Sequence, residues 1–244
     1  MTGADTGKAR TLAVIPARGG SKRIPRKNLR HFVGRPMIAW AIEGARASGL
    51  FERIVVSTDD AEIAAIARAH GAEIPFMRPA DLADDHSPTV PVVAHAVRSL
   101  QAMGWVPGPV CCIYPAVPLL QAADLKRGLA LLLAGAPGYV FPVAAYPSPV
   151  QRALLRDADG ASRPMQPLHA LTRTQDLTPA FFDAGQFYWA TAQTWCEGQA
   201  IHAHAHTLEL PAWRVVDIDT PDDWHRAELL CRAMGLTAAA PVSA

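Results

Sequence analysis

The sequence predicts an α/β protein with a Rossmann-like, three-layer architecture around a mostly parallel sheet. Short apolar and β-branched runs alternate with helical patterns of about a dozen residues, which is the rhythm of right-handed β-α-β crossovers. The first run, TLAVIPA at 11–17, leads directly into a basic, glycine-containing loop, as strands do where such sheets bind their ligands. The 244 residues are 50% hydrophobic, which is enough for one sizeable core.

The expected elements follow this alternation along most of the chain. The helix at 36–49 carries apolar residues at helical spacing and ends at Gly49, a residue suited to a helix C-terminus. Strands are expected at 11–17, 53–60, 72–76, 109–115, 139–146, 185–190 and 213–220. Helices are expected at 36–49, 61–71, 89–100 and 123–135, and a last one from Pro221.

The alternation breaks after Tyr146. From 147 to 183 the chain is richer in Pro, Arg, Gln and Thr and has no clean helical period, which predicts a β-hairpin or arm that leaves the sheet. An arm without its own core needs a surface to pack on. A second copy of the chain is the simplest partner, so we expect a homodimer. The chain then divides into a disordered extension at 1–10, a single domain at 11–234 and a frayed tail at 235–244.

Composition narrows the class of protein further. The 23 Lys and Arg residues nearly balance 22 Asp and Glu residues, for a net charge of +1, so there is no global basic field for nucleic acid. No apolar run approaches the roughly 20 residues of a membrane span, and the first ten residues lack a secretory signal. The four cysteines match no zinc or disulfide spacing. We therefore expect a cytoplasmic protein with reduced thiols that binds neither nucleic acid nor membrane.

The segment VIPARGGSKRIPRKN, residues 14–28, concentrates positive charge directly after the first strand. Glycines let backbone N–H groups approach an anion, and cationic side chains add charge-assisted hydrogen bonds worth roughly 1.5–3 kcal/mol each. The residues expected to hold a triphosphate are Arg18, Gly19, Gly20, Ser21, Lys22 and Lys27. Their order matches neither the P-loop nor the GxGxxG dinucleotide motif. The alternative is a solvated basic loop that binds nothing.

A pair of aspartates lies near the end of the chain in VVDIDT. On a strand, Asp217 and Asp219 would project from one face, with Ile218 on the other. Two adjacent carboxylates repel unless a cation or a shared proton lies between them, and Mg²⁺ accepts one or two carboxylates together with phosphate oxygens and water. We therefore expect Mg²⁺ as the cofactor of this pair. The alternative is a helix cap, for which Thr220 before Pro221 is better placed.

Two other constellations favour structural roles. His202, His204 and His206 would share one face of a strand, which is able to bind a transition metal, but a solvated strand face is the simpler interpretation. Asp59 and Asp60 come after IVVS, at the end of the second strand, and are expected to cap the next helix.

The chain is similar to the cytidylyltransferases that activate nine-carbon keto-sugar acids and related sugars as CMP conjugates. The motifs that carry the resemblance are PARGGSKRIPRKN, STDDAEIAAIARAHGAEIPFMRPADLADD and DIDTPDDW. The family pattern R-x-G-S-K-x-x-x-x-K-N is present in full at Arg18, Gly20, Ser21, Lys22, Lys27 and Asn28. Within the family, DAGQFYWA and TRTQDL look most like the branch that acts on pseudaminic acid for bacterial surface and flagellar glycans. The resemblance covers about 12–234.

This resemblance implies roles for the residues that match the family's motifs. The implied nucleotide-binding residues are Arg18, Gly20, Ser21, Lys22, Lys27, Asn28, Arg78 and Thr89. The implied sugar-binding residues are Tyr114, Arg173, Gln186, Phe187 and Tyr188, with Arg173 reaching across the dimer. One departure is Ala116 and Val117, which replace residues that often carry a hydroxyl in the family.

The implied reaction is in-line attack by the anomeric hydroxyl of pseudaminic acid on the α-phosphorus of CTP, with release of pyrophosphate. Asp217 and Asp219 would hold Mg²⁺, and Lys22 and Arg18 would stabilise the departing pyrophosphate. These four are the expected catalytic residues, and no general base is assigned. The alternatives are the same reaction on N-acetylneuraminic, legionaminic or octulosonic acid, and a non-catalytic CTP-binding protein.

Overall fold

The computed structural model describes residues 10–84 and 87–236, and its mixed α/β fold confirms the expected class. The extension expected at 1–10 and the tail expected at 235–244 lie almost wholly outside the described residues. No described helix is long and apolar enough to cross a membrane. All four cysteines are free, and three of them are buried.

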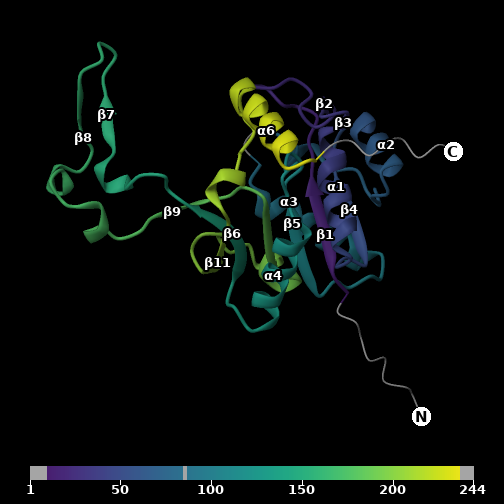
Figure 1. The fold of residues 1–244 in the computed structure, drawn as a ribbon. Helices are drawn as coiled ribbons and strands as arrows, with labels where there is room; N and C mark the ends of the chain where they lie inside the picture. The colour runs from purple at the N-terminus through teal and green to yellow at the C-terminus, as the bar shows by residue number, and fades with distance from the viewer. Residues whose placement is uncertain (1–9, 85–86, 237–244) are drawn as a thin grey trace.

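The central sheet has the strand order β11-β6-β10-β5-β1-β4, and β9 pairs with β6 off this path (Figure 1). Its strands are β1 (Leu12–Pro16), β4 (Arg53–Ser57), β5 (Pro109–Ile113), β6 (Tyr139–Ala145), β9 (Phe181–Asp183), β10 (Phe187–Thr191) and β11 (Ala205–Glu209). β1 runs parallel to β4 and β5, and β11 runs parallel to β6. β10 is antiparallel to both its neighbours, β5 and β6. The sheet is therefore mostly parallel, with an antiparallel strand at its middle.

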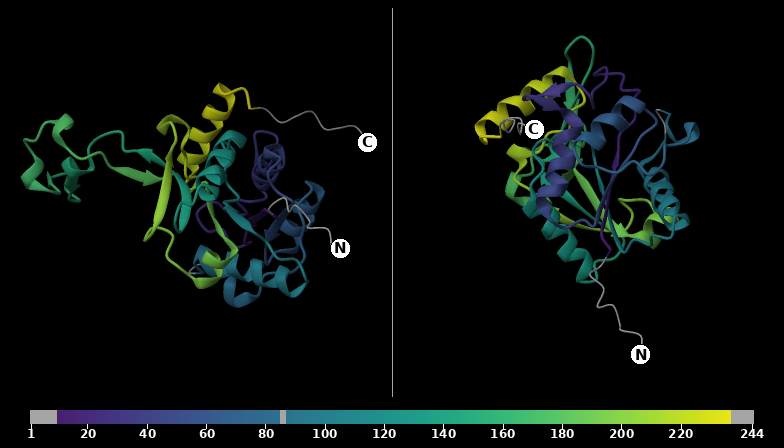
Figure 2. Two further views of the ribbon diagram at one scale, coloured as in Figure 1. Left: turned by 90° about the horizontal axis from the view of Figure 1, so that it is seen from below. Right: turned by 90° about the vertical axis from the view of Figure 1, so that its right-hand side faces the viewer.

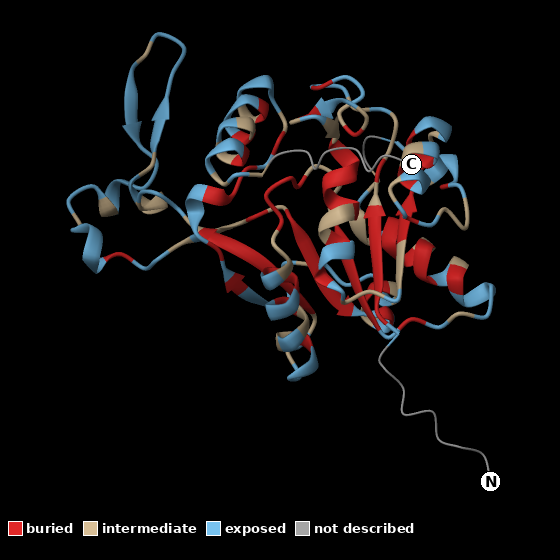
Figure 3. Cartoon of the chain, turned by 45° about the vertical axis from the view of Figure 1, so that its right-hand side comes forward, coloured by how far each residue is buried: buried red, intermediate tan, exposed pale blue. Residues whose placement is uncertain are grey.

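Helices cover both faces of this sheet. One face packs against α1 (Met37–Ser48), α2 (Ala61–Ala69) and α4 (Ala122–Leu133), and the other against α3 (Thr89–Ala102) and α5 (Ala192–Glu197). Side chains of β1 alternate between the two cores, because successive residues of a strand point to opposite faces. Figure 3 shows the buried strands enclosed between the helices.

A third, smaller core lies beneath α6 (Pro221–Ala233). Ile24 and Phe32 come from the segment after β1, and Val216, Ile218 and Trp224 come from the end of the chain. The rings of Phe32 and Trp224 meet edge to face with centroids 5.1 Å apart. This packing brings the segment that carries the aspartate pair against the basic loop. The short strands β2 (His31–Phe32) and β3 (Arg35–Pro36) complete that loop.

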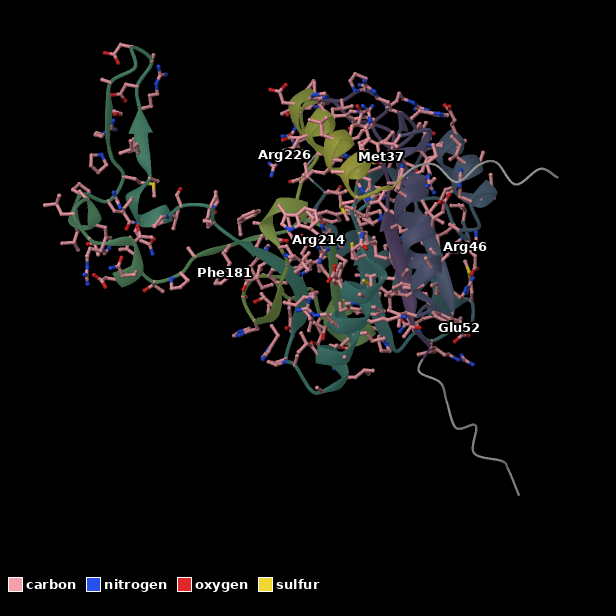
Figure 4. All side chains as sticks on the ribbon, viewed as in Figure 1. Met37, Arg46, Glu52, Phe181, Arg214 and Arg226 are labelled. Atoms are coloured by element: carbon pink, nitrogen blue, oxygen red, sulfur yellow. The ribbon has the colours of Figure 1, made fainter. Side chains whose placement is uncertain are left out.

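The expected arm leaves the sheet between β6 and β9. It contains a hairpin of β7 (Leu154–Arg156) and β8 (Ser162–Pro164) and the 3₁₀ turns η2 (Val150–Arg152), η3 (Pro167–His169) and η4 (Thr174–Asp176). Figure 1 and the left view of Figure 2 show it projecting far from the rest of the chain. Figure 4 shows Phe181 where the arm rejoins the body and the arm's side chains standing clear of it.

Two expected strands are wrong. At 72–76 only an isolated bridge forms, between Val55 and Glu73, because Pro75 has no N–H to continue the ladder. At 213–220 the chain makes the 3₁₀ turn η5 (Ala212–Arg214) and then runs without strand pairing. Its alternating pattern is satisfied by burying Val216 and Ile218 against α6. An alternation of apolar and polar residues indicates which side chains are buried, but it does not indicate whether the backbone pairs with a sheet.

The interpretation of the histidines as a shared strand face is also wrong. β11 begins at Ala205, so His202 and His204 precede it and only His206 lies on the strand. Among the described residues there is no group of three or more His, Cys, Asp or Glu side chains able to hold a metal ion.

Candidate active site

A cleft of about 680 Å³ opens where β1 and β5 end. This is a size typical of small-molecule and cofactor sites. It contains many of the residues that the sequence pointed to, although they come from distant parts of the chain. Those that line it are Arg18, Ser21, Lys22, Lys27, Asn28, Arg78, Thr89, Tyr114, Asp217 and Asp219. Gly20, Arg173, Gln186, Phe187 and Tyr188 do not line it.

The basic loop is held in place by Asn28. Its side-chain amide donates to the carbonyl oxygen of Arg18 at 3.1 Å, and its own backbone carbonyl accepts from the amide of Ile38 at 2.9 Å. Asn28 is buried, and its Oδ1 has no hydrogen-bond partner among the described residues. A buried polar atom without a partner is uncommon, so this oxygen is an unsatisfied acceptor in a residue that lines the cleft.

The two glycines of the loop have different surroundings. The backbone N–H of Gly19 donates to Asp59 Oδ1 at 3.2 Å, and a Cβ at Gly19 would lie 2.6 Å from Asp60 Oδ2. A Cβ at Gly20 would meet no heavy atom within 4 Å. Position 19 therefore requires a glycine, because a side chain there would collide with Asp60 after β4. Position 20 has room for a side chain. Asp60 caps α2 as expected, accepting from the amides of Glu62 and Ile63.

Arg78 is buried with its guanidinium group at the cleft. It donates through Nε to Ser57 Oγ at 3.1 Å and also to the Ser57 carbonyl oxygen. Burial lowers the pKa of Arg78 from its ordinary value, but an arginine stays cationic because its ordinary pKa exceeds 12. The result is a fixed positive charge at the carboxyl end of β4.

The aspartates lie opposite the loop. Lys27 Nζ donates to the carbonyl oxygen of Ile218 at 2.6 Å and approaches Asp219 Oδ1 at 3.4 Å, and Arg23 pairs with Asp219 Oδ2 at 2.8 Å. Asp217 has neither a hydrogen bond nor an ion pair among the described residues. Desolvation in the cleft, and then repulsion by Asp219, raise the pKa of Asp217 above its ordinary value.

This arrangement fits a hard dication. The two carboxylates are neighbours, and ionisation of Asp217 is energetically unfavourable. A bound cation would reduce this cost, so the pair is suited to binding one. Mg²⁺ needs only one or two carboxylates when phosphates and water complete its shell. Thr220 makes the predicted cap: it forms a capping box with Asp223 at the start of α6. The helix cap therefore requires neither aspartate of the pair.

The residues predicted for the sugar side are more scattered. Tyr114 lies on the cleft wall, where its Oη is hydrogen-bonded at 3.0 Å to Oγ1 of Thr89, a residue predicted for the nucleotide. Gln186 and Tyr188 are buried behind Tyr114, and the backbone amide of Tyr114 donates to the Gln186 carbonyl at 2.9 Å. Gln186 Oε1 has no partner among the described residues. Strand alternation sends Phe187 to the opposite core, where it is fully buried, so within this chain it contacts no ligand in the cleft.

Arg173 lies on the arm, well away from the cleft lining. It pairs with Asp176 at 2.7 Å, and its side chain is exposed. Within one copy of the chain this residue does not reach the cleft. Its expected reach into the cleft of a second copy stays a prediction.

Sequence reasoning missed other polar residues at the site. Arg23, Asp84 and Ser87 line the cleft, and Ser87 Oγ donates to Asp84 at 2.6 Å. Asp183 lies behind the wall and accepts from Tyr188 Oη at 2.9 Å. Arg23 belongs to the basic segment, so that segment could have indicated it. Asp183 is visible in the sequence only as the first letter of DAGQFYWA.

The three-layer fold, and a basic, glycine-containing loop that faces a pair of carboxylates, are those of a nucleotidyltransferase. The chain belongs to the cytidylyltransferase family, whose profile matches residues 12–164. It is 39% identical over 222 residues to the pseudaminic acid cytidylyltransferase of Campylobacter jejuni (strain 81-176), covering 91% of this chain and 96% of that protein. It is 32% identical to the CMP-N,N'-diacetyllegionaminic acid synthase of Legionella pneumophila, over 91% and 96% of the two chains.

Solved structures support the fold. The structure of CMP:2-keto-3-deoxy-manno-octonic acid synthetase complexed with CTP superposes with a TM-score of 0.69, covering 93% of this chain and 100% of that one. The sequence identity is 17%, so this comparison speaks for the fold alone.

Proposed function

We propose that this enzyme transfers CMP from CTP to the anomeric hydroxyl of pseudaminic acid and releases pyrophosphate. The observation that carries the proposal is the cleft in which the RGGSK loop faces Asp217 and Asp219. The choice of sugar is supported by the similarity to pseudaminic acid cytidylyltransferases along 91% of the chain. The legionaminic acid synthase is a more distant relative. Because the reaction consumes CTP, the cytoplasm remains the expected compartment.

The roles we assign follow from charge and position in the cleft. Arg18, Lys22 and Lys27 would bind the phosphates, and Arg18 and Lys22 would stabilise the charge that develops on the departing pyrophosphate. Arg78 and Thr89 would hold the base or ribose. Fixed cations of this kind accelerate phosphoryl chemistry because they need little reorganisation during the reaction.

Asp217 and Asp219 would hold Mg²⁺, which when bound supplies charge neutralisation for the triphosphate and lowers the pKa of the attacking hydroxyl. Lys27 and Arg23 keep Asp219 in place. Replacement of Asp219 by Asn is expected to abolish turnover without unfolding the protein. Near-normal turnover in that variant would overturn the assignment of the pair.

We also propose a homodimer formed through the arm. Leu168 is 86% exposed and Leu171 is 97% exposed, and exposed apolar patches mark surfaces that bind a partner. The same contact would place Arg173 at the cleft of the second copy.

The experiment that tests the function measures pyrophosphate release by the purified protein with CTP and Mg²⁺. Pseudaminic, N-acetylneuraminic, legionaminic and octulosonic acids are supplied separately, with the Asp219→Asn variant as the inactive control. Release with pseudaminic acid alone would support both the reaction and the sugar. Release with a different sugar would keep the reaction and replace the substrate, and no release with any of them would favour a CTP-binding protein without catalysis.

A further inference from the structure

The two aspartates of the cleft differ in their cationic partners. Asp219 has one at each carboxylate oxygen, because Arg23 reaches Oδ2 at 2.8 Å and Lys27 approaches Oδ1 at 3.4 Å. Asp217 lines the same cleft but makes no ion pair among the described residues. Of the two carboxylates that would bind a divalent cation, one is therefore already engaged by side chains of the basic loop.

The two partners of Asp219 are held differently. The side chain of Lys27 is only 20% exposed, and its Nζ also donates to the carbonyl oxygen of Ile218 at 2.6 Å. The side chain of Arg23 is 68% exposed, and within the described part of the chain it makes no ion pair except that with Asp219. An ion pair this exposed is weak, because water competes for both partners. Arg23 is therefore the partner that another cation can replace.

The carboxylate itself is held in place by the start of α6. The backbone amides of Asp219 and Thr220 donate to Asp223 Oδ2 at 3.2 Å and 2.8 Å. The capping box between Thr220 and Asp223 fixes the same turn. An exchange of partners at Asp219 therefore requires movement of the exposed Arg23 side chain and no rearrangement of the backbone.

We propose that Arg23 is an internal counterion that competes with the divalent cation for Asp219. A guanidinium group at hydrogen-bond distance takes up one of the two oxygens and repels a second cation beside it. A triphosphate in the cleft would end this competition, because its oxygens offer the guanidinium a stronger anionic partner. The protein thus binds a bare divalent cation weakly and takes up the metal together with the nucleotide. The identity of that anion as a triphosphate rests on the proposed function.

Binding of Mn²⁺ to the metal-free protein without nucleotide tests the competition. Mn²⁺ suits this purpose because it prefers carboxylate and water oxygens, as Mg²⁺ does, and the EPR signal of aqueous Mn²⁺ measures the unbound ion. Arg23→Gln should lower the Kd for Mn²⁺ about 5-fold, as for removal of an exposed ion pair from the site. Arg23→Lys should stay within about two-fold of the wild type, because the contact with Asp219 is a single one that an ammonium group can also make.

Two further variants separate competition from a change in overall charge. Arg26→Gln is the matched control, because Arg26 is an exposed arginine of the same loop that pairs with Asp60 at 2.6 Å and not with Asp219. It removes the same unit charge and should leave the Kd for Mn²⁺ within about two-fold of the wild type. The double variant Arg23→Gln, Asp219→Asn should bind Mn²⁺ no more tightly than Asp219→Asn alone, since the carboxylate that Arg23 occupies is then absent.

Each outcome decides the inference. An unchanged Kd in Arg23→Gln would show that Arg23 does not compete, and an equal fall in Arg26→Gln would assign the effect to the charge of the loop. Absence of Mn²⁺ binding in every form would also overturn the inference, because Arg23→Gln is expected to bind. Pyrophosphate release tests the proposed function separately. If the wild type releases none with any sugar, that function fails, while the Mn²⁺ titrations still decide whether Arg23 competes for Asp219.

Discussion

At the scale of single residues, Gly19 and Gly20 are neighbours with separable roles. A methyl group at Gly19 would collide with Asp60, which caps α2 and pairs with Arg26 at 2.6 Å. Gly19→Ala should therefore cost about 0.5–2 kcal/mol of stability, as for loss of a helix cap. Gly20→Ala meets open space and should leave the unfolding midpoint unchanged. It should nevertheless raise the KM for CTP about tenfold, because the methyl group would stand beside Ser21, which lines the cleft, and would hold the phosphates away from the backbone.

Thermal unfolding and CTP kinetics of the two variants check this pair. The prediction depends on the contrast between them, since each variant adds the same methyl group. An unchanged KM for CTP in Gly20→Ala would show that the phosphates do not approach this part of the loop.

Asp217 gives a prediction about pH. Its raised pKa means that its ionised form is less favourable in the folded protein than in the unfolded chain. This penalty is absent at low pH, where both states are neutral, and appears as the pH rises above the ordinary aspartate pKa of about 4. Asp217→Asn should therefore raise the Tm of the metal-free protein at about pH 7 and leave it unchanged below about pH 4. Turnover should fall at least about 10²-fold, as for loss of a preorganised electrostatic group.

Tm profiles between these pH values measure the effect. Asp222→Asn is the control, because Asp222 lies in the first turn of α6, where negative charge is favourable. It should leave the Tm unchanged or lower it. If both variants raise the Tm equally, the cause is general charge reduction and not the surroundings of Asp217.

At the scale of elements, a buried ion pair anchors the segment that carries the aspartates. Arg214 in η5 donates to Asp124 of α4 at 2.6 Å, and both side chains are buried. Figure 4 marks Arg214 within the body of the protein. Asp124→Ala would leave a buried guanidinium without its partner and should cost about 3–5 kcal/mol. Because η5 directly precedes Asp217, the rate of pyrophosphate release should fall as well.

Urea denaturation measures the cost, and the exposed pair of Asp157 and Arg163 at 3.1 Å provides the comparison. Asp157→Ala should change stability by no more than about 1 kcal/mol. Similar values for the two variants would argue that the Arg214 pair does not hold the segment.

The elements also show what the sequence could and could not predict. The buried parallel strands β1, β4 and β5 were predictable, because strands covered on both faces read as continuous apolar runs. The lack of strand pairing at 213–220 was not predictable, since Val216 and Ile218 alternate in the same way while packing on α6.

The same distinction holds for the site. Most cleft residues were predictable because they follow strand ends or belong to a recognisable motif. Asp183 was not, since its hydrogen bonds with Tyr188 and His202 form only in the folded chain and belong to no motif. The place of Phe187 in the opposite core was not predictable for a related reason: a motif identifies a strand, but only the register of that strand tells which side chains face the cleft.

At the scale of the whole molecule, the arm is the feature that a single copy of the chain leaves unexplained. It projects away from its own body (left view of Figure 2), yet it carries the exposed Leu168 and Leu171. Burying two leucines is worth about 3–6 kcal/mol, which is a substantial part of a micromolar association. The double variant Leu168→Asp, Leu171→Asp should therefore convert a dimer into a folded monomer, as measured by sedimentation velocity. The control variant is Leu133→Asp, because Leu133 is 63% exposed and lies at the end of α4, away from the arm. This variant should remain dimeric. If Arg173 binds a ligand in the cleft of the partner, the monomeric variant should lose turnover while its Tm stays unchanged. A wild-type protein that sediments as a monomer at every concentration would refute the dimer, and the arm would then need a different partner.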